Sequence, residues 1–305
     1  MQSKEAIETG LADIISKYGK FSFDIPLPFG IWTNGNLQHA HTRLKRIIQA
    51  SSDLVGKPLS ECSVLDLGCL DGMFTIEFAL HGAKAVGVEV RESHVKKAMF
   101  CKEILELSNL TFVQDDARNI SKEALGSFDI IVCSGLLYHL TAEDAIGLVE
   151  KMYSMTNRLL IIDTQIGLIP EVKVTKNGED YYGVEYIEHS DADTQDKKSK
   201  KLWASWDNAK SFWFTRPSLT NLLKKVGFSS IHESYIPGEF EYRDRVTFVS
   251  VKGTVKELFT SPAVNSLSVS FPEEGGKVAL KNDFNKNLFL QKVKGKLSQI
   301  KNKFG

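Results

Sequence analysis

The sequence predicts an α/β fold: a doubly wound, mostly parallel sheet of seven strands that ends in an antiparallel hairpin. Short apolar segments alternate with helical segments, which is typical of βαβ units. A glycine-rich turn follows the first apolar segment, and Pro237-Gly238 joins the last two. The chain has 305 residues, of which 42% are hydrophobic and 25% charged, enough for one such domain with additions.

The first 50 residues precede this alternation, and we expect residues 1–50 to form a cap of helix and loop. Residues 1–20 carry apolar side chains at helical spacing. Residues 21–36 are rich in proline, glycine and aromatic residues, which predicts a loop, and a second helix follows it.

Residues 51–163 are predicted to form the larger part of the core. The strand segments are rich in valine, isoleucine and leucine, as expected for strands buried on both faces. Helices between parallel strands imply right-handed crossovers. The predicted strands are 64–68, 85–89, 110–114, 129–134 and 158–163, and the predicted helices are 73–81, 92–107, 119–125 and 142–154.

Residues 164–214 break this rhythm as an insertion with a polar middle and an aromatic end. The core resumes over residues 215–252 with a helix that Pro217 begins and Gly227 ends. The predicted elements of this part are a helix at 217–226 and strands at 229–236 and 245–252. Residues 253–305 form a C-terminal extension beyond the fold.

The end of that extension, residues 287–303, is predicted to be a basic amphipathic helix. Phe289, Val293, Leu297 and Ile300 recur on one helical face, and lysines occupy the other. Two interpretations stay open: a solvated terminal helix packed on the fold, or a helix that makes peripheral contact with the inner membrane surface.

Bulk properties narrow the class of protein. The formal net charge is zero, so nothing global indicates nucleic acid or acidic substrates. The four cysteines lack the spacing of a zinc site, so we expect no metal, and they fit a reducing compartment. The polar N-terminus is unlike a signal peptide and no stretch is long and apolar enough to span a bilayer, which predicts a cytoplasmic protein.

The segment from Val64 to Phe74, VLDLGCLDGMF, carries the strongest functional signal. It predicts a buried strand followed by a turn whose glycines let backbone N–H groups approach a ligand. Glu89 ends the next predicted strand, 23 residues after Asp66. A carboxylate at that position can accept both hydroxyls of a ribose.

This arrangement resembles the first motif of class I S-adenosylmethionine-dependent methyltransferases, Asp-x-Gly-x-Gly-x-Gly, with Leu70 at the middle glycine. The resemblance covers roughly residues 40–252 by motif order and implies S-adenosylmethionine as cofactor. It assigns cofactor contacts to Asp66, Gly68, Cys69, Leu70, Asp71, Gly72, Glu89, Val90, Asp116, Ala117 and Ser134.

The same resemblance gives these residues roles. Asp66 anchors the glycine loop, which faces the methionine part of the cofactor, and Glu89 binds the ribose. The segment after the third predicted strand resembles the third motif of the family, in which a carboxylate accepts the adenine amino group. Asp116 is the better placed acid for this role, and Asp115 is the alternative.

His139 is the predicted catalytic residue. It stands in the segment from Cys133 to Leu140, which resembles the fourth motif and the turn after it. Methylation of a hydroxyl requires removal of a proton, for which histidine is suited near neutral pH. The alternative is that its imidazole packs against a neighbouring loop. Weaker candidates, each more simply explained as structural or solvated, are His39, His41, His189 and Asp163.

Aromatic residues gather at the end of the insertion: Trp203, Trp206, Phe212, Trp213 and Phe214. They form either a packed hinge or a lid whose flat faces stack a sugar, a base or an aromatic acceptor. Trp32 and Phe29 are the candidates for the opposite wall.

The segments Ser134–His139 and Phe214–Phe228 look like the branch that contains tRNA wobble-uridine carboxymethyltransferases and many uncharacterised bacterial methyltransferases of glycans or metabolites. Leu202–Trp206 looks like the latter group. We therefore expect O-methylation of a small-molecule or sugar-containing acceptor. The acceptor itself, the oligomeric state and the choice between S-adenosylmethionine and its carboxylated relative stay open.

Three other functions rank below this one. A tRNA-modifying enzyme would need basic surface for RNA phosphates, and the core is not basic. A non-catalytic module is motivated by Leu70, which departs from the motif. An NAD-dependent oxidoreductase would need G-x-G-x-x-G, which the turn from Gly68 to Gly72 lacks.

Overall fold

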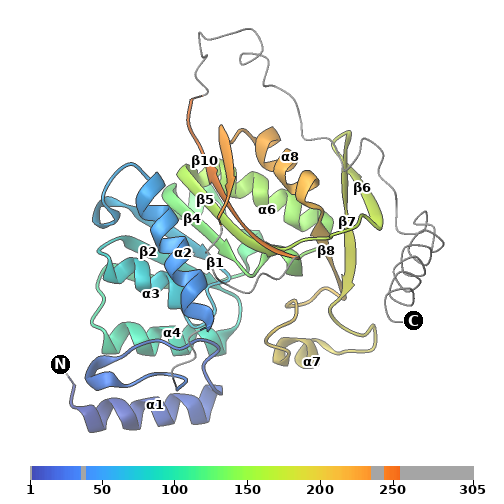
Figure 1. Ribbon diagram of the computed structural model, residues 1–305. Coiled ribbons are helices and arrows are strands. Elements are labelled where there is room, and N and C mark those ends of the chain that lie inside the picture. The colour runs from blue at the N-terminus through green and yellow to red at the C-terminus, as the bar shows by residue number, and fades with distance from the viewer. Residues whose placement is uncertain (1, 36–38, 235–243, 255–305) are drawn as a thin grey trace, which may run out of the picture.

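The computed structural model describes residues 2–35, 39–234 and 244–254, and a seven-stranded sheet lies at its centre (Figure 1). The strand order is β3-β2-β1-β4-β5-β10-β9. Strands β1 to β5 pair in parallel, and β10 is antiparallel to both of its neighbours. The bounds are β1 Ser63–Leu67, β2 Lys84–Glu89, β3 Leu110–Gln114, β4 Phe128–Ser134, β5 Thr156–Gln165, β9 Ser230–Glu233 and β10 Arg245–Val251. The predicted fold class is confirmed.

Helices cover both faces of this sheet (Figure 1). Val64 and Leu65 are adjacent in β1 but belong to different hydrophobic clusters, because successive side chains of a strand point to opposite faces. The first cluster includes residues of α1 to α4, and the second includes residues of α6 and α8. The bounds are α1 Lys4–Tyr18, α2 His39–Leu54, α3 Met73–Leu80, α4 Glu92–Ile104, α5 Lys122–Leu125, α6 Ala142–Met155 and α8 Arg216–Val226.

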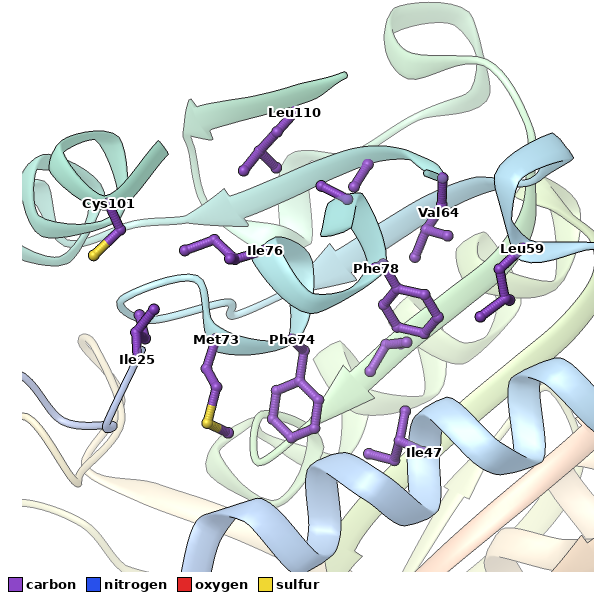
Figure 2. Close-up of a cluster of buried hydrophobic side chains, with 14 of the residues drawn as sticks. Ile25, Ile47, Leu59, Val64, Met73, Phe74, Ile76, Phe78, Cys101 and Leu110 are labelled. Atoms are coloured by element: carbon purple, nitrogen blue, oxygen red, sulfur yellow. The ribbon is translucent and has the colours of Figure 1, made fainter. Parts of the chain in front are cut away.

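Figure 2 shows how the first cluster fixes the helix that follows the glycine turn. Phe74 and Phe78 of α3 are buried beside Val64 of β1 and Ile47 of α2. Full burial of each such side chain stabilises the fold by about 1.5–3 kcal/mol. Helix α3 is therefore held against the sheet on the cap side, and the turn before it is positioned by that packing.

The helix predicted at 217–226 begins and ends as expected. Thr215 caps α8 by accepting a hydrogen bond from the Ser218 N–H, and Pro217 lies in the first turn. Gly227 ends the helix with φ 118°, and a Cβ there would lie 2.4 Å from the Tyr153 hydroxyl. Only glycine fits at that position.

The helix predicted at 119–125 is shorter than expected. Asp116 caps a 3₁₀ turn over Ala117–Asn119, and Ser121 then caps the four-residue helix α5. Two cap residues five positions apart divide the segment, because each of them lies in extended conformation outside its own helix.

The insertion contains a second sheet that the sequence analysis did not predict (Figure 1). Its elements are β6 Val172–Lys176, β7 Glu179–Ile187, α7 Gln195–Lys200 and β8 Lys210–Phe214. All strand pairs in this sheet are antiparallel. Phe212 and Phe214 of β8 are buried in the second hydrophobic cluster, and the Phe212 N–H donates to the Leu140 carbonyl at 2.8 Å. The insertion is thus fastened to the loop after β4.

Some predictions fall outside the described residues. They are the basic helix at 287–303, the rest of the extension after residue 254, and the end of the strand predicted at 229–236. Within the described ranges, none of the helices is both long and apolar enough to cross a membrane. All four cysteines are buried and free.

Candidate functional site

A cavity of about 200 Å³ lies at the carboxyl ends of the parallel strands, where ligands bind in open α/β sheets. It brings together most of the predicted site residues: Gly68, Leu70, Glu89, Val90, Asp116, Ala117, Ser134 and His139. The other four predicted residues, Asp66, Cys69, Asp71 and Gly72, do not line it. These four lie in or next to the glycine loop, so any effect they have on a ligand passes through the shape of that loop.

The glycine loop keeps its shape without the middle glycine. Gly68 has φ 67°, and its N–H and that of Cys69 both donate to the Val88 carbonyl, at 2.9 and 3.1 Å. Leu70 has φ 49°, a left-handed conformation that costs about 1–2 kcal/mol for a residue with a side chain. Its N–H donates to Glu89 Oε2 at 3.1 Å, which helps to offset that strain.

Glu89 holds the loop and faces the cavity at the same time. Its side chain is buried, one carboxylate oxygen accepts from the Leu70 N–H, and the other accepts from the Arg91 N–H at 2.8 Å. Each oxygen of an ionised carboxylate has about two acceptor sites. Glu89 therefore retains the capacity to accept the two hydroxyls of a ribose.

Asp66 lies beneath the loop. Its carboxylate is buried and accepts a hydrogen bond of 2.6 Å from the Thr75 hydroxyl of α3. Burial raises the pKa of Asp66 to about 7, and the nearby Glu89 charge adds to this shift, although the bonds from Thr75 oppose it. The predicted anchoring role agrees with this contact.

Asp71 connects the loop to the N-terminal cap. Its buried carboxylate lies 2.5 Å from His94 Nδ1 and 3.0 Å from Lys97 Nζ, and it accepts from the Ser22 N–H. Burial opposes ionisation of Asp71, but the hydrogen bond and charge of His94 and the charge of Lys97 lower its pKa. Lys97 also donates to the Lys20 carbonyl at 2.9 Å. Sequence reasoning missed His94 and Lys97, because a lysine on an amphipathic helix is normally solvated.

The adenine side of the predicted site carries a further cation. The Asp116 carboxylate accepts from the Arg118 guanidinium, which also donates to Asp207 Oδ2 at 2.6 Å. Arg118 and Asp207 both line the cavity. Asp116 therefore shares its acceptor sites between Arg118 and any ligand.

The aromatic residues at the end of the insertion lie in two environments. Trp203 and Trp206 line the cavity, whereas Phe212 and Phe214 are buried in the second hydrophobic cluster. Leu202 to Asn208 line the cavity, and the Arg91 guanidinium holds that segment by donating to the Ala204 carbonyl at 2.9 Å. Trp203 lies edge-on to Phe23 of the cap, with ring centroids 6.4 Å apart. Phe23 lines the cavity, whereas Trp32 and Phe29 do not, so the prediction that these two residues form its other wall was wrong.

His139 forms a pair with a carboxylate that the sequence analysis missed. His139 Nδ1 lies 2.8 Å from Glu188 Oε1, and Glu188 Oε2 accepts from the Ser205 N–H at 3.0 Å. Burial opposes ionisation of Glu188, but the hydrogen bond and charge of His139 and the hydrogen bond from the Ser205 N–H lower its pKa. Because Glu188 takes Nδ1, Nε2 of His139 is the nitrogen left for chemistry in the cavity.

The weaker histidine candidates make structural contacts. His189 is buried and its Nε2 lies 2.8 Å from the Ser205 carbonyl, while His41 Nε2 lies 3.1 Å from the Asp24 carbonyl. The side chain of His39 lies outside the described residues. Over the described ranges, no three histidine, cysteine or acidic side chains gather in a way that would hold a metal ion.

Ser134 offers a test of whether the cavity fits the cofactor that the resemblance implies. Its hydroxyl is buried, lines the cavity and has no hydrogen-bond partner among the residues that the structure describes. A buried polar atom needs a partner, and a bound ligand can supply it. Together with Gly68 at the cavity wall and the acceptor sites of Glu89, this hydroxyl fits S-adenosylmethionine.

Comparison with known proteins agrees with this geometry. A family model described as a methyltransferase domain matches residues 38–233. Two curated relatives are a ubiquinone biosynthesis O-methyltransferase of Acinetobacter baylyi, 28% identical over 98 residues, and a magnesium-protoporphyrin O-methyltransferase of Synechocystis, 30% identical over 101 residues. Each match covers 32% of this chain and spans 39% and 42%, respectively, of the relative. The chain thus spans about two fifths of the length of these relatives.

A solved structure with a similar fold is the N-terminal domain of EvdMO1, determined in the presence of SAH and D-fucose. It aligns with a TM-score of 0.61 and 20% identity, over 83% of this chain and 97% of that domain. At this level of identity the likeness concerns the fold alone.

Proposed function

The chain belongs to the methyltransferase-domain family, and we propose that it transfers a methyl group from S-adenosylmethionine to a hydroxyl oxygen of a small-molecule or sugar-containing acceptor. The observation that carries the proposal is the pairing of His139 with the buried Glu188 at the wall of the cavity. Transfer to oxygen requires a group that removes a proton, and this pair provides one.

The cofactor is S-adenosylmethionine, which supplies a methyl group already activated on a sulfonium sulfur. Four parts of the cavity would hold it. Glu89 would accept hydrogen bonds from the ribose hydroxyls, and Asp116 and the Ala117 N–H would contact the adenine. The backbone at Gly68 would approach the methionine part, and the Ser134 hydroxyl would gain the cofactor as its hydrogen-bond partner.

The protein side of the reaction is positioning and proton removal. Glu188 fixes the imidazole through Nδ1, so Nε2 of His139 would receive the proton of the acceptor hydroxyl. The ionised Glu188 then stabilises the imidazolium. The segment around Trp203 and Trp206 covers the cavity and limits the access of water.

The alternative functions have less support than O-methylation. The tRNA alternative would need a basic RNA surface, and the chain as a whole has zero formal charge. The non-catalytic alternative depended on Leu70 blocking the loop. Yet Leu70 lies at the wall of a cavity of about 200 Å³, and its N–H is used by Glu89.

Acceptor pairs that differ in one atom test the proposal. Calorimetry first measures the binding of S-adenosylhomocysteine (SAH) and of NAD to the full chain. The chain is then incubated with S-adenosylmethionine that carries a labelled methyl group and with pairs of acceptors, such as a phenol and an aniline or a hydroxy sugar and an amino sugar. We expect micromolar SAH binding, none with NAD, and label transfer to the hydroxyl member of a pair. The His139→Ala variant should lose at least ~100-fold of that rate. Transfer to amines alone, or absence of SAH binding by the folded protein, would refute it.

A further inference from the structure

Three arginines surround one buried carboxylate at the edge of the cavity. Asp163 of β5 accepts from Arg245 Nε of β10 at 2.7 Å and from Arg43 Nη1 of α2 at 3.3 Å. Arg46 Nη2, one turn further along α2, lies 3.9 Å from the same carboxylate. The Asp163 side chain is 1% exposed, and those of Arg43 and Arg245 are 22% exposed.

The arginine cluster, Arg43, Arg46 and Arg245, has more positive charge than the described acidic residues around it can neutralise. Asp163 is the one acidic group within 4.0 Å of them among residues 2–35, 39–234 and 244–254, which leaves two positive charges in excess. Its carboxylate also accepts from the Thr247 hydroxyl at 2.6 Å, so little of its capacity remains. Burial lowers the pKa of Arg43, and the nearby Arg245 charge lowers it further, while Asp163 raises it. Partly buried charges of this kind are stabilised by a counterion.

Two members of the cluster face the cavity and the third does not. Arg43 and Arg245 line it, whereas Arg46 is not among its lining residues. The Arg245 guanidinium lies 5.5 Å from the centre of the Tyr138 ring, and that ring is 4.2 Å from the ring of His139. Arg245, which carries part of the excess positive charge, and His139, the proposed base, thus both lie next to the ring of Tyr138.

We propose that Arg43 and Arg245 bind an anionic group of the acceptor, a carboxylate or a phosphate, while its hydroxyl faces His139. The inference rests on the proposed function, because it takes the region beside His139 as the acceptor site. Guanidinium groups match the two oxygens of such anions and hold them more strongly than a neutral donor does. The substrate class is then a hydroxylated acid or phosphate ester, and Asp163 keeps both guanidinium groups in place.

Binding of small anions to the SAH-saturated full chain tests this site without a known acceptor. The probes are benzoate and phenyl phosphate, with benzamide as the neutral counterpart of benzoate, titrated by NMR. We expect an anionic probe to bind at least ~10-fold more tightly than benzamide. Arg43→Gln should lower the affinity for that probe by ~10-fold or more, because one charge-assisted contact is lost. Arg43→Lys should lower this affinity less.

Arg46→Gln is the matched control, because it removes the same charge from the same helix without changing the cavity wall. It should alter probe affinity less than ~3-fold, and SAH affinity should stay unchanged in all variants, which shows that they fold. Equal binding of benzoate, phenyl phosphate and benzamide, or equal losses in Arg43→Gln and Arg46→Gln, would overturn the inference. A further result would overturn it: carboxylated S-adenosylmethionine binds more tightly than S-adenosylmethionine, and Arg43→Gln removes this gain in affinity. The anion that Arg43 binds would then belong to the methyl donor. Failure of SAH to bind the wild type refutes the proposed function instead.

Discussion

The two halves of the cavity are constructed differently. At the ends of β1 and β2, the wall is formed by residues close together in the sequence, from Gly68 to Arg91. At the ends of β4, β5 and β10, it is made of side chains from distant segments, and Arg43, His139 and Arg245 come from the cap, the core and the final strand. A ligand feature shared by a whole family can be met by one contiguous motif, whereas an acceptor that varies is met by side chains brought from elsewhere.

This difference predicts that substitutions in the two halves impair different properties of the protein. Substitutions in the Gly68–Arg91 half should abolish cofactor binding. Substitutions in the half around His139 should reduce the rate of transfer and leave cofactor affinity unchanged. If changes on both sides had the same effect, the two halves would have to be regarded as one site.

The largest expected effect is that of Gly68→Arg. Gly68 has φ 67° and lines the cavity, and even a Cβ there would lie 3.2 Å from Leu136 Cβ. A long side chain must therefore enter the cavity, and we expect SAH affinity to fall at least ~100-fold in calorimetry.

The matched control is Gly126→Arg, at the end of α5. Gly126 has φ 81°, so it carries a similar backbone penalty, but a Cβ there would meet nothing within 4 Å. This variant should bind SAH as the wild type does. Equal affinity of the Gly68 variant and the wild type would show that the cofactor does not approach this loop.

A smaller effect, on rate alone, is expected for Glu188→Gln. The substitution keeps the size of the side chain but removes the charge that orients His139 and stabilises its imidazolium. We expect kcat to fall about 10- to 100-fold with a hydroxyl acceptor, measured by methyl transfer, while SAH affinity changes less than twofold.

Glu185→Gln is the control for this prediction. Glu185 lies three residues before Glu188, near the end of β7, but it is exposed and pairs with Lys210 at the surface. Its substitution should leave kcat unchanged. A loss of SAH affinity in Glu188→Gln equal to the loss of kcat would indicate that Glu188 only supports the fold of the insertion.

What could be predicted from the sequence follows the same division. The positions of the core strands, the glycine loop and Glu89 come from local patterns, because periodicity, turns and strand ends are properties of short segments. Glu188 could not be foreseen, because it lies 49 residues from His139 in an insertion whose strands alternate with many polar residues. Nor could the arginine cluster around Asp163, whose members are up to 202 positions apart (245 − 43) and meet only through tertiary packing.

The smallest expected effect concerns Asp66, which supports the cofactor half from beneath without touching the cavity. Its pKa is about 7 in the folded chain and near 3.8 in the unfolded one, so between these values the folded state holds a proton that the unfolded state has lost. The free energy of unfolding that Asp66 contributes therefore falls as pH rises from about 4 to 7, and falls no further above that. Asp66→Asn keeps an acceptor for Thr75 and removes this titration. Relative to the wild type, the free energy of unfolding of the variant should therefore rise by about 2–3 kcal/mol between pH 5 and pH 8. Urea unfolding of both proteins at the two pH values measures the difference, and carboxylates with lowered pKa, such as Asp163, contribute equally to both. A difference that does not vary with pH would mean that Asp66 is ionised throughout, with the glycine loop held by a buried charge.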